Sequence, residues 1–336
     1  MTDAFTIYQV DAFTLPRTPE QNIRTSNKSA QFSGNPAAVI PLVNWLSTEC
    51  MQAIAESNNL SETVFFVKDD DGIYDIRWFT PTVEVPLCGH ASLASAYVIA
   101  TQLNDPRDII PFRCQNNTLL FSARINRGDL LTVSLEFLIE PVKRIVDIDY
   151  KNQIESIVGK KITSLFRARD LIAVLENHKE VDSCTPDFTA IKQLDEFALV
   201  ITAYINENEK NDPHHDLHSV DFVSRFFAPR QGILEDPVTG SSFCGLTPLW
   251  STELSDQIRN DDRSEQLDDN NGLSQHTEIK VSKTHEKNKQ KMSINRLVAR
   301  QRSRRQGHID LILQEHNVIM TGHCFLYMKG TIFIKE

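Results

Sequence analysis

The sequence predicts a protein of mixed helices and strands that is built from two similar halves, and three observations support this. The chain has 336 residues, which is enough for about two domains of ordinary size. Short runs of alternating apolar and polar residues, typical of strands, recur along the chain with helical patterns between them. One arrangement also occurs twice: an aromatic strand ending in proline, then an acidic residue and a second proline, then small residues that open a helix.

Composition and charge exclude several classes of protein. Forty per cent hydrophobic residues can form real cores, and the formal charge of −10 argues against a nucleic-acid partner. The six cysteines are widely spaced without a C-x-x-C pair, so we expect reduced thiols rather than disulfides or a zinc site. We see no signal-peptide pattern and no apolar stretch near the roughly 18 residues that span a bilayer. A cytoplasmic protein without a membrane partner is therefore expected.

In the first half, a helix and a strand precede the repeated arrangement. Ser47 predicts the N-cap of a helix over residues 47–58, and Asn59 predicts its end because asparagine tolerates left-handed geometry. The next strand covers residues 64–67. Glu62 stands at the junction, where it either points into a cleft at the sheet edge or is an ordinary solvated loop residue. The segments expected before this helix are a strand over 5–13, a loop over 16–34, a turn at 34–36 and a strand over 37–42.

The first copy of the repeated arrangement spans residues 77–100. Residues 77–81 (Arg-Trp-Phe-Thr-Pro) read as a strand, and two prolines bracket a short segment at 82–85. Residues 88–90 (Cys-Gly-His) then lead into a run over 91–100 without proline or glycine, which predicts a helix with a slim first turn. The free N–H groups and positive partial charge of that turn favour an anion, most simply a substrate carboxylate.

The second copy lies more than a hundred residues further along. Residues 226–229 (Phe-Phe-Ala-Pro) are followed by residues 235–246 (Glu-Asp-Pro-Val-Thr-Gly-Ser-Ser-Phe-Cys-Gly-Leu) and a candidate helix that ends near Trp250. Two similar halves would each aim a helix start at a shared crevice, where a small carboxylate could be held. The alternative is two ordinary strand-turn-helix corners.

Two further segments carry hypotheses of their own. The cluster His214, His215, Asp216 and His218 is either a metal site or part of a surface loop, and the preceding Asn-Asp-Pro favours the loop, so we expect no metal. Residues 255–293 are rich in Asp, Asn and Gln and then in Lys, with few apolar residues, which predicts a loosely packed insertion. The other elements expected are strands over 110–138, a helix over 151–158, strands over 171–176 and 197–204, and closing strands over 309–313 and 324–334.

Taken together, these motifs resemble those of the PhzF-like proteins of phenazine biosynthesis, relatives of the diaminopimelate epimerase fold. The matching segments occur in family order across nearly the whole chain outside the charged insertion. They are residues 10–13 (Val-Asp-Ala-Phe), 34–39 (Gly-Asn-Pro-Ala-Ala-Val), 59–63 (Asn-Leu-Ser-Glu-Thr), 77–81, 87–92 (Leu-Cys-Gly-His-Ala-Ser), 225–229, 235–241 and 301–303 (Gln-Arg-Ser).

The resemblance implies an α+β fold of two pseudo-symmetric domains, each a curved, mostly antiparallel sheet or barrel around a central helix. We expect a first lobe over 1–120 and a second over 121–310 that includes the insertion. Closing strands over 311–336 can return to the first lobe. The active site would lie between the lobes, and family members often form homodimers.

The resemblance also implies isomerase chemistry that needs no metal or organic cofactor. Glu62 would be the acid/base that moves a proton between carbons of a small, cyclic amino- or hydroxy-carboxylic acid. His90 and Asp236 would be the other catalytic residues. The residues expected around the substrate are Cys88, Gly89, Ala91, Gly240, Ser241 and Ser242.

Two other functions stay open at this point. In related epimerases paired cysteines work on opposite faces of a carbon, and Cys88 with Asp236 would be a mixed version of that pair. Cys88 is alternatively a small buried core thiol. A non-catalytic binding protein that uses the insertion as its contact is the second possibility. Phe243 replaces a polar residue that is more common in the family, and a ring of this size could narrow or reshape the pocket, so the identity of the substrate stays open.

Overall fold

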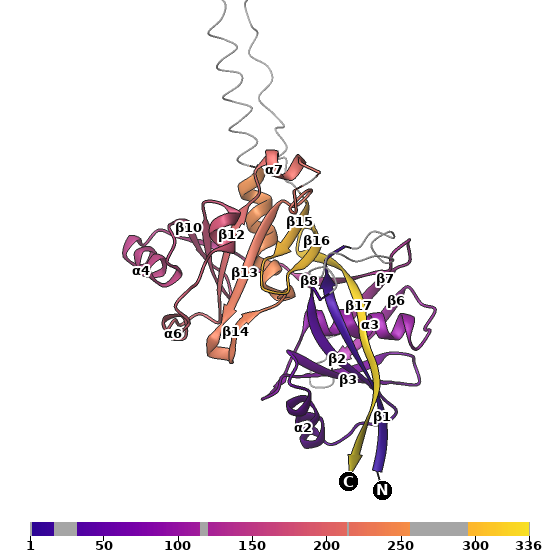
Figure 1. The fold of residues 1–336 in the computed structure, drawn as a ribbon. Helices are drawn as coiled ribbons and strands as arrows, with labels where there is room; N and C mark the ends of the chain where they lie inside the picture. Colours follow the sequence, from indigo (N-terminus) through magenta and orange to yellow (C-terminus); the bar gives the residue numbers. More distant parts are fainter. Residues whose placement is uncertain (1, 17–31, 115–119, 214, 256–294, 336) are drawn as a thin grey trace, which may run out of the picture.

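The computed structural model describes residues 2–16, 32–114, 120–213, 215–255 and 295–335 of the chain. Its first lobe is a closed barrel in which each strand pairs with the next and the last pairs with the first (Figure 1). The β2–β3 and β4–β6 pairs are parallel and the others antiparallel. In ring order the strands are β1 (Thr2–Thr14), β2 (Asn35–Leu42), β3 (Glu62–Lys68), β4 (Tyr74–Phe79), β6 (Ile109–Cys114), β7 (Leu120–Asn126), β8 (Thr132–Leu138) and β17 (Asn317–Lys335).

Helix α3 (Gly89–Thr101) runs through the barrel and is buried on all sides. Its residues are mostly alanine, serine and short aliphatic side chains, so a helix of small diameter fits inside a ring of strands. The helix expected over 91–100 is thus confirmed, with its first turn at Gly89. Two smaller elements lie nearby, namely α2 (Thr48–Asn58) on the outside of the barrel and β5 (Glu84–Val85) beside β4.

The second lobe is a sheet buried on both faces. The helix described over residues 243–255 packs on one face, and helices α4 to α6 cover the other. This explains the continuous apolar runs of β11 and β12, whose alternate residues enter the two cores. The strands are β9 (Lys143–Ile145), β10 (Ile162–Arg167), β11 (Leu171–Leu175), β12 (Leu199–Tyr204), β13 (Phe222–Ala228), β14 (Ile233–Asp236), β15 (Arg296–Gln301) and β16 (Gly307–Leu313). The helices are α4 (Ile148–Val158), α5 (His178–Asp182), α6 (Phe188–Ile191), α7 (Glu207–Asn211), η1 (Pro229–Gln231) and η2 (Gly240–Ser242).

Strand β17 belongs to both lobes. Its residues 318–321 pair with β16 of the second lobe, while residues 317–323 pair with β8 and residues 323–335 with β1. The expected division after residue 120 cuts β7 at its first residue, and β7 pairs with β6, so the first barrel continues to Leu138. The barrel cannot close without β7 and β8, because β7 pairs with β8 and β8 pairs with β17.

The α+β class with two lobes that each combine a mostly antiparallel sheet with a helix, expected from the sequence, is confirmed. Among the residues described, no helix is long and apolar enough to cross a bilayer. The charged insertion lies almost wholly outside the described residues, with only its first residue, Ser255, inside the helix over 243–255.

Candidate active site

The two copies of the repeated arrangement meet at their helix starts. Gly89 opens α3, and Gly240 opens η2, which leads directly into the helix over 243–255. A Cβ atom built on Gly89 would lie 4.0 Å from the Cα of Gly240. Because neither residue has a side chain, the two backbones approach closely, and both helix starts face one region between the lobes.

Glu62 reaches this region from the first strand after α2. The helix ends at Asn59, whose left-handed backbone (φ 48°) turns the chain, and β3 then begins at Glu62, next to the start of β2. The Glu62 side chain is only 12% exposed, and its Oε2 lies 2.8 Å from Nε2 of His90. A glutamate that would otherwise be a solvated loop residue is therefore buried against a histidine.

His90 is buried in the first turn of α3, and its Nδ1 lies 3.5 Å from Sγ of Cys88. Burial lowers the pKa of His90, but the contacts with Cys88 and Glu62 outweigh burial and leave that pKa raised well above its usual value. Burial and the Glu62 charge raise the pKa of Cys88, although His90 and the Ala91 N–H lower it. The raised pKa of Cys88 favours its thiol form, and Glu62 is the carboxyl group paired with His90.

Asn35 joins these groups to the second lobe. Its Nδ2 donates to Oδ1 of Asp236 and to the carbonyl oxygen of Val238, both at 3.0 Å, and its Oδ1 accepts from the Ser61 hydroxyl at 2.9 Å. Both amide hydrogens are therefore used, although Nδ1 of His90 also lies 3.3 Å from Nδ2. The hydrogen on Nδ1 of a charged His90 is consequently donated to Sγ of Cys88 and not to Asn35.

The backbone before Asn35 accepts only glycine. Gly34 has φ +86°, and a Cβ atom there would lie 2.5 Å from the carbonyl oxygen of Ala12. This conformation places Asn35 at the inner start of β2, fully buried.

Asp236 is held at the end of β14 by a turn with its own supports. Its Oδ2 accepts from the Thr239 hydroxyl, and Gln301 accepts from the Thr239 N–H and donates to the Asp236 carbonyl oxygen, each at 2.8 Å. Burial raises the pKa of Asp236, opposed by the charge of His90 and by hydrogen bonds from Thr239 and Asn35. Asp236 is thus a buried carboxyl group in the same electrostatic cluster as His90.

The other residues that follow Gly240 differ in exposure, with Ser241 partly exposed and Ser242 and Phe243 buried. The Ser241 hydroxyl, partly exposed, accepts from Nη2 of Arg169 at 3.1 Å, while the buried Ser242 hydroxyl donates to the carbonyl oxygen of Thr239 at 2.8 Å. Phe243 is fully buried, and its ring centroid lies 6.2 Å from that of Phe222. Contrary to the possibility raised by its size, Phe243 does not narrow the pocket, because its ring belongs to the hydrophobic core.

Comparison with known proteins identifies the family. The profile described as "Phenazine biosynthesis-like protein" matches residues 28–297. An uncharacterized isomerase of Pseudomonas aeruginosa is 32% identical over 329 residues, which are 98% of this chain and 99% of that protein. The chain belongs to the PhzF-like family. A second uncharacterized isomerase of that bacterium is 38% identical, covering 74% of this chain and 82% of the relative.

Solved structures agree with this assignment. The crystal structure of a PhzF-family phenazine biosynthesis protein from Enterococcus faecalis has a TM-score of 0.74 and 31% identity, covering 99% of this chain and all of that one. A Bacillus anthracis PhzF-family protein, at 16% identity and a TM-score of 0.69 over 99% of this chain and all of that one, shares the fold. This PhzF-like chain is thus related to proteins named isomerases.

Sequence reasoning left out three residues that hold the site together: Asn35, Thr239 and Gln301. Asn35 was taken for part of a turn signal, and Gln301 stood in a matching segment without a role. The available signal was an amide side chain at the end of a strand, since a buried amide must find partners: Asn35 begins β2 and Gln301 ends β15.

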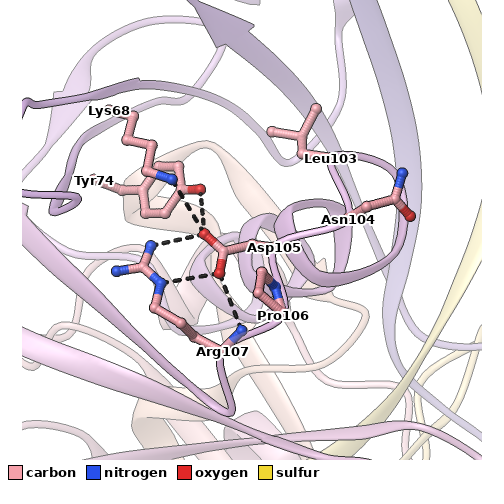
Figure 2. A pocket seen from close by; sticks show the side chains of 7 residues that line it. All are labelled: Lys68, Tyr74, Leu103, Asn104, Asp105, Pro106 and Arg107. Carbon is pink, nitrogen blue, oxygen red and sulfur yellow. Dashed lines mark hydrogen bonds and ion pairs between the residues drawn. The ribbon is translucent and has the colours of Figure 1, made fainter.

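A pocket lies at the other end of α3, which at 13 residues is about 20 Å long. It has a volume of about 530 Å³, and its polar groups satisfy each other (Figure 2). Asp105 accepts from the Tyr74 hydroxyl at 2.9 Å and from two nitrogens of the Arg107 guanidinium at 2.9 and 2.7 Å. Burial and Asp105 raise the pKa of Tyr74 to about 12. We interpret this pocket as a structural feature.

Glu62, Cys88 and His90 could in principle hold a metal ion, since their ligand atoms lie within 4.8 Å of one another. However, the raised pKa values of Cys88 and His90 mean that both residues keep protons that a metal would have to displace. Binding of a metal ion here would therefore release protons from these residues.

Proposed function

We propose that this PhzF-like protein is an isomerase that moves a proton between carbons of a small, cyclic amino- or hydroxy-carboxylic acid, with Glu62 as the acid/base. The observation that carries the proposal is the 2.8 Å contact between Oε2 of Glu62 and Nε2 of His90, at the point where the two lobes meet. The reaction uses one carboxylate in both directions and so needs no organic cofactor.

The class of substrate follows from the two helix starts. Among the described residues no side chain caps the start of α3, where Cys88 is the N-cap residue, and none caps the start of η2. Free N–H groups at a helix start bind anions, and two starts that face each other suit the two oxygens of a carboxylate.

Proton transfer then follows from the pair Glu62 and His90. The Glu62 carboxylate removes a proton from a substrate carbon and returns it to another carbon, which general acid–base catalysis requires of a single positioned group. The charged His90 compensates the negative charge of Glu62 and fixes its orientation. Negative charge that builds on the substrate is stabilised by the helix-start N–H groups.

Asp236 is the polar side chain that the second lobe contributes to the site. It is buried, anchored by Asn35 and Thr239, and comes from the other lobe. A carboxyl group in this position suits the amine or hydroxyl group of the substrate. The Cys88/Asp236 racemase is less well supported, because burial keeps the Cys88 thiol protonated.

The test is deuterium incorporation from heavy water into a panel of cyclic amino acids and amino-hydroxy acids. We expect the wild type to exchange at least one panel member and Glu62→Gln to lose about 10²–10⁴-fold of that rate. Glu49→Gln, on the exposed first turn of α2, is the matched control and should keep full activity.

Each contrary result points to another function. An active Glu62→Gln variant together with an inactive Cys88→Ser variant would favour the thiol mechanism. Binding of a panel acid without exchange in the wild type would favour a non-catalytic binding protein.

A further inference from the structure

A second group of ligand-type side chains lies in the second lobe, away from the cluster of Glu62 and His90. It comprises His178 at the start of α5, Glu209 on α7, and His215 in the turn before β13, with their ligand atoms all within 4.8 Å of one another. Nε2 of His178 lies 3.1 Å from Oε1 of Glu209, and the two imidazole rings meet edge to face with centroids 5.8 Å apart.

The group includes part of the histidine run that the sequence singles out. His215 belongs to it, whereas His218 is exposed and Asp216 does not join it as a ligand. His214 lies outside the described residues. The sequence favoured a loop here because Asn-Asp-Pro precedes the histidines, and the fold now brings His178 and Glu209 beside His215.

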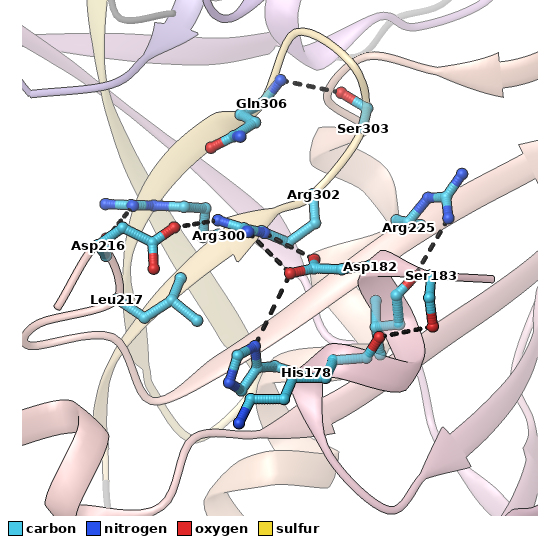
Figure 3. A network of polar contacts seen from close by, with 12 residues as sticks. His178, Asp182, Ser183, Asp216, Leu217, Arg225, Arg300, Arg302, Ser303 and Gln306 are labelled. Carbon is cyan, nitrogen blue, oxygen red and sulfur yellow. Dashed lines mark hydrogen bonds and ion pairs between the residues drawn. The ribbon is translucent and has the colours of Figure 1, made fainter. Parts of the chain in front are cut away.

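Each histidine has a carboxylate behind it. Nδ1 of His178 lies 3.8 Å from Oδ2 of Asp182, and Nδ1 of His215 lies 3.5 Å from Oδ1 of Asp216. Arg302 holds both carboxylates: its Nε and Nη2 donate to Asp182 at 2.8 Å, and its Nη1 donates to Asp216 at 2.7 Å (Figure 3). Nδ1 of His178 faces Asp182, and Nδ1 of His215 accepts from the Leu217 N–H at 3.2 Å, so Nε2 is the atom of each ring left for a ligand.

A carboxylate beside Nδ1, as Asp182 is for His178, supports metal-binding histidines in proteins because it orients the ring and raises its basicity. His178 is only 6% exposed, and its Nδ1 makes no hydrogen bond among the described residues. A buried imidazole without a partner on one nitrogen and with a carboxylate oxygen on the other is costly unless the ring has a further task.

We propose that His178, Glu209 and His215 bind a divalent cation of the zinc class. Two imidazole nitrogens and one carboxylate oxygen suit Zn²⁺, whereas Ca²⁺ and Mg²⁺ prefer oxygen ligands alone. Three protein ligands leave a fourth tetrahedral position for water. The ion would fasten α5, α7 and the turn before β13 to one another.

The geometry needs only a small adjustment. Ligand atoms of a tetrahedral zinc site are about 3.3 Å apart, given bonds of about 2.0–2.1 Å, and the His178–Glu209 distance already matches. Asn206 occupies Oε2 of Glu209 and leaves Oε1 for the ion. Lys179 lies 3.9 Å from Oε1 but is 77% exposed, so its ammonium group can move into solvent.

The test is zinc titration of the full chain, free of any affinity tag and stripped of metal, in competition with a chromophoric chelator. We expect one Zn²⁺ per chain from this site, and His215→Ala, in which a half-exposed ligand is removed, should weaken binding at least about 100-fold. His218→Ala, an exposed histidine three residues away, is the matched control and should bind like the wild type. Asp182→Asn should weaken binding about 10–100-fold.

Two further readouts keep the test decisive. Zn²⁺ should raise the Tm of the wild type and of His218→Ala but not of His215→Ala, because a ligand that binds only the folded state stabilises it. Absence of zinc binding in the wild type, or unchanged binding in His215→Ala, would overturn the proposal. Loss of the ion in Cys88→Ser alone would assign it instead to the cluster of Glu62, Cys88 and His90.

Discussion

Nδ2 of Asn35 donates to Oδ1 of Asp236 over 3.0 Å, and this bond joins residues that are 201 positions apart in the chain. Asn35 starts β2 in the barrel, and Asp236 ends β14 in the second lobe. Both side chains are buried, so the two lobes are held together at the candidate active site by a polar contact shielded from water.

Asn35→Ala should therefore weaken both the fold and the site. It removes the Asn35 hydrogen bonds to Oδ1 of Asp236, to the Val238 carbonyl oxygen and from the Ser61 hydroxyl, and a buried group left unpaired costs about 1–3 kcal/mol. We expect the free energy of unfolding, measured by urea denaturation, to fall by about 2–4 kcal/mol. Asn211→Ala, an exposed asparagine on α7, should change it by less than about 0.5 kcal/mol; equal losses in both variants would contradict the prediction.

The pKa of His90 should depend on Glu62. In the wild type that pKa is raised well above 6.5, so an NMR titration should find a charged imidazole at neutral pH. In Glu62→Gln the negative partner is lost while burial remains, so the midpoint should move down. A midpoint that stays in place would show that another group holds the His90 proton.

The same pair predicts how stability changes with pH. Because the folded-state pKa of His90 is raised, its pair with Glu62 contributes stability fully below the unfolded-state value of about 6.5. That contribution is lost as pH rises through the folded-state pKa. Urea denaturation should therefore show that Glu62→Gln costs more stability at about pH 6 than at alkaline pH; a difference independent of pH would contradict this coupling.

Cys88 should be chemically inert. Burial raises its pKa, and the thiolate is the reactive form, so iodoacetamide should modify Cys50, which is partly exposed, well before Cys88. Peptide mapping after timed alkylation measures this order. Cys88→Ser should keep at least about a tenth of the exchange activity, since Glu62 carries the proton transfer; rapid modification of Cys88 would favour the thiol mechanism.

Two glycines of β17 should respond differently to alanine. A Cβ atom on Gly322 would lie 2.3 Å from the buried ring of Phe13, whereas one on Gly330 would meet nothing closer than 3.8 Å. Gly322→Ala should lower the free energy of unfolding by about 1–3 kcal/mol through overpacking. Gly330→Ala, the control in the same strand, should be close to neutral by thermal denaturation; a similar loss in both would argue against this packing.

Local sequence signals predicted the local structure well. Ser47 accepts from the Cys50 N–H at 3.1 Å and Asn59 ends the helix in the left-handed region, as their residue types indicated. The run after Cys88 forms the expected helix, because small apolar residues without proline or glycine leave few other conformations. The structure also brings the expected Glu62, His90 and Asp236 into one cluster, and their catalytic roles remain predictions.

Long-range pairing was less predictable. The barrel extends past residue 120 because β7 and β8 pair toward β17, which lies almost 180 residues further along the chain. No local pattern specifies which distant strand will be the neighbour. The roles of Asn35 and Phe243 could not be predicted for the same reason, because their partners lie far away in the sequence. Asn35 bridges the lobes through Asp236, and Phe243 packs in the core against Phe222.

The path of β17 also has a consequence for the order in which the molecule can assemble. During synthesis the segments that form β1 to β8 emerge from the ribosome early, but the strand that closes their ring, residues 317–335, comes last. Until then β1 and β8 are unpaired edges, which are prone to associate with other chains. The first lobe to be translated is thus the last to be completed. A nascent chain that stalls before residue 317 would leave an open sheet whose unpaired edges are prone to aggregate.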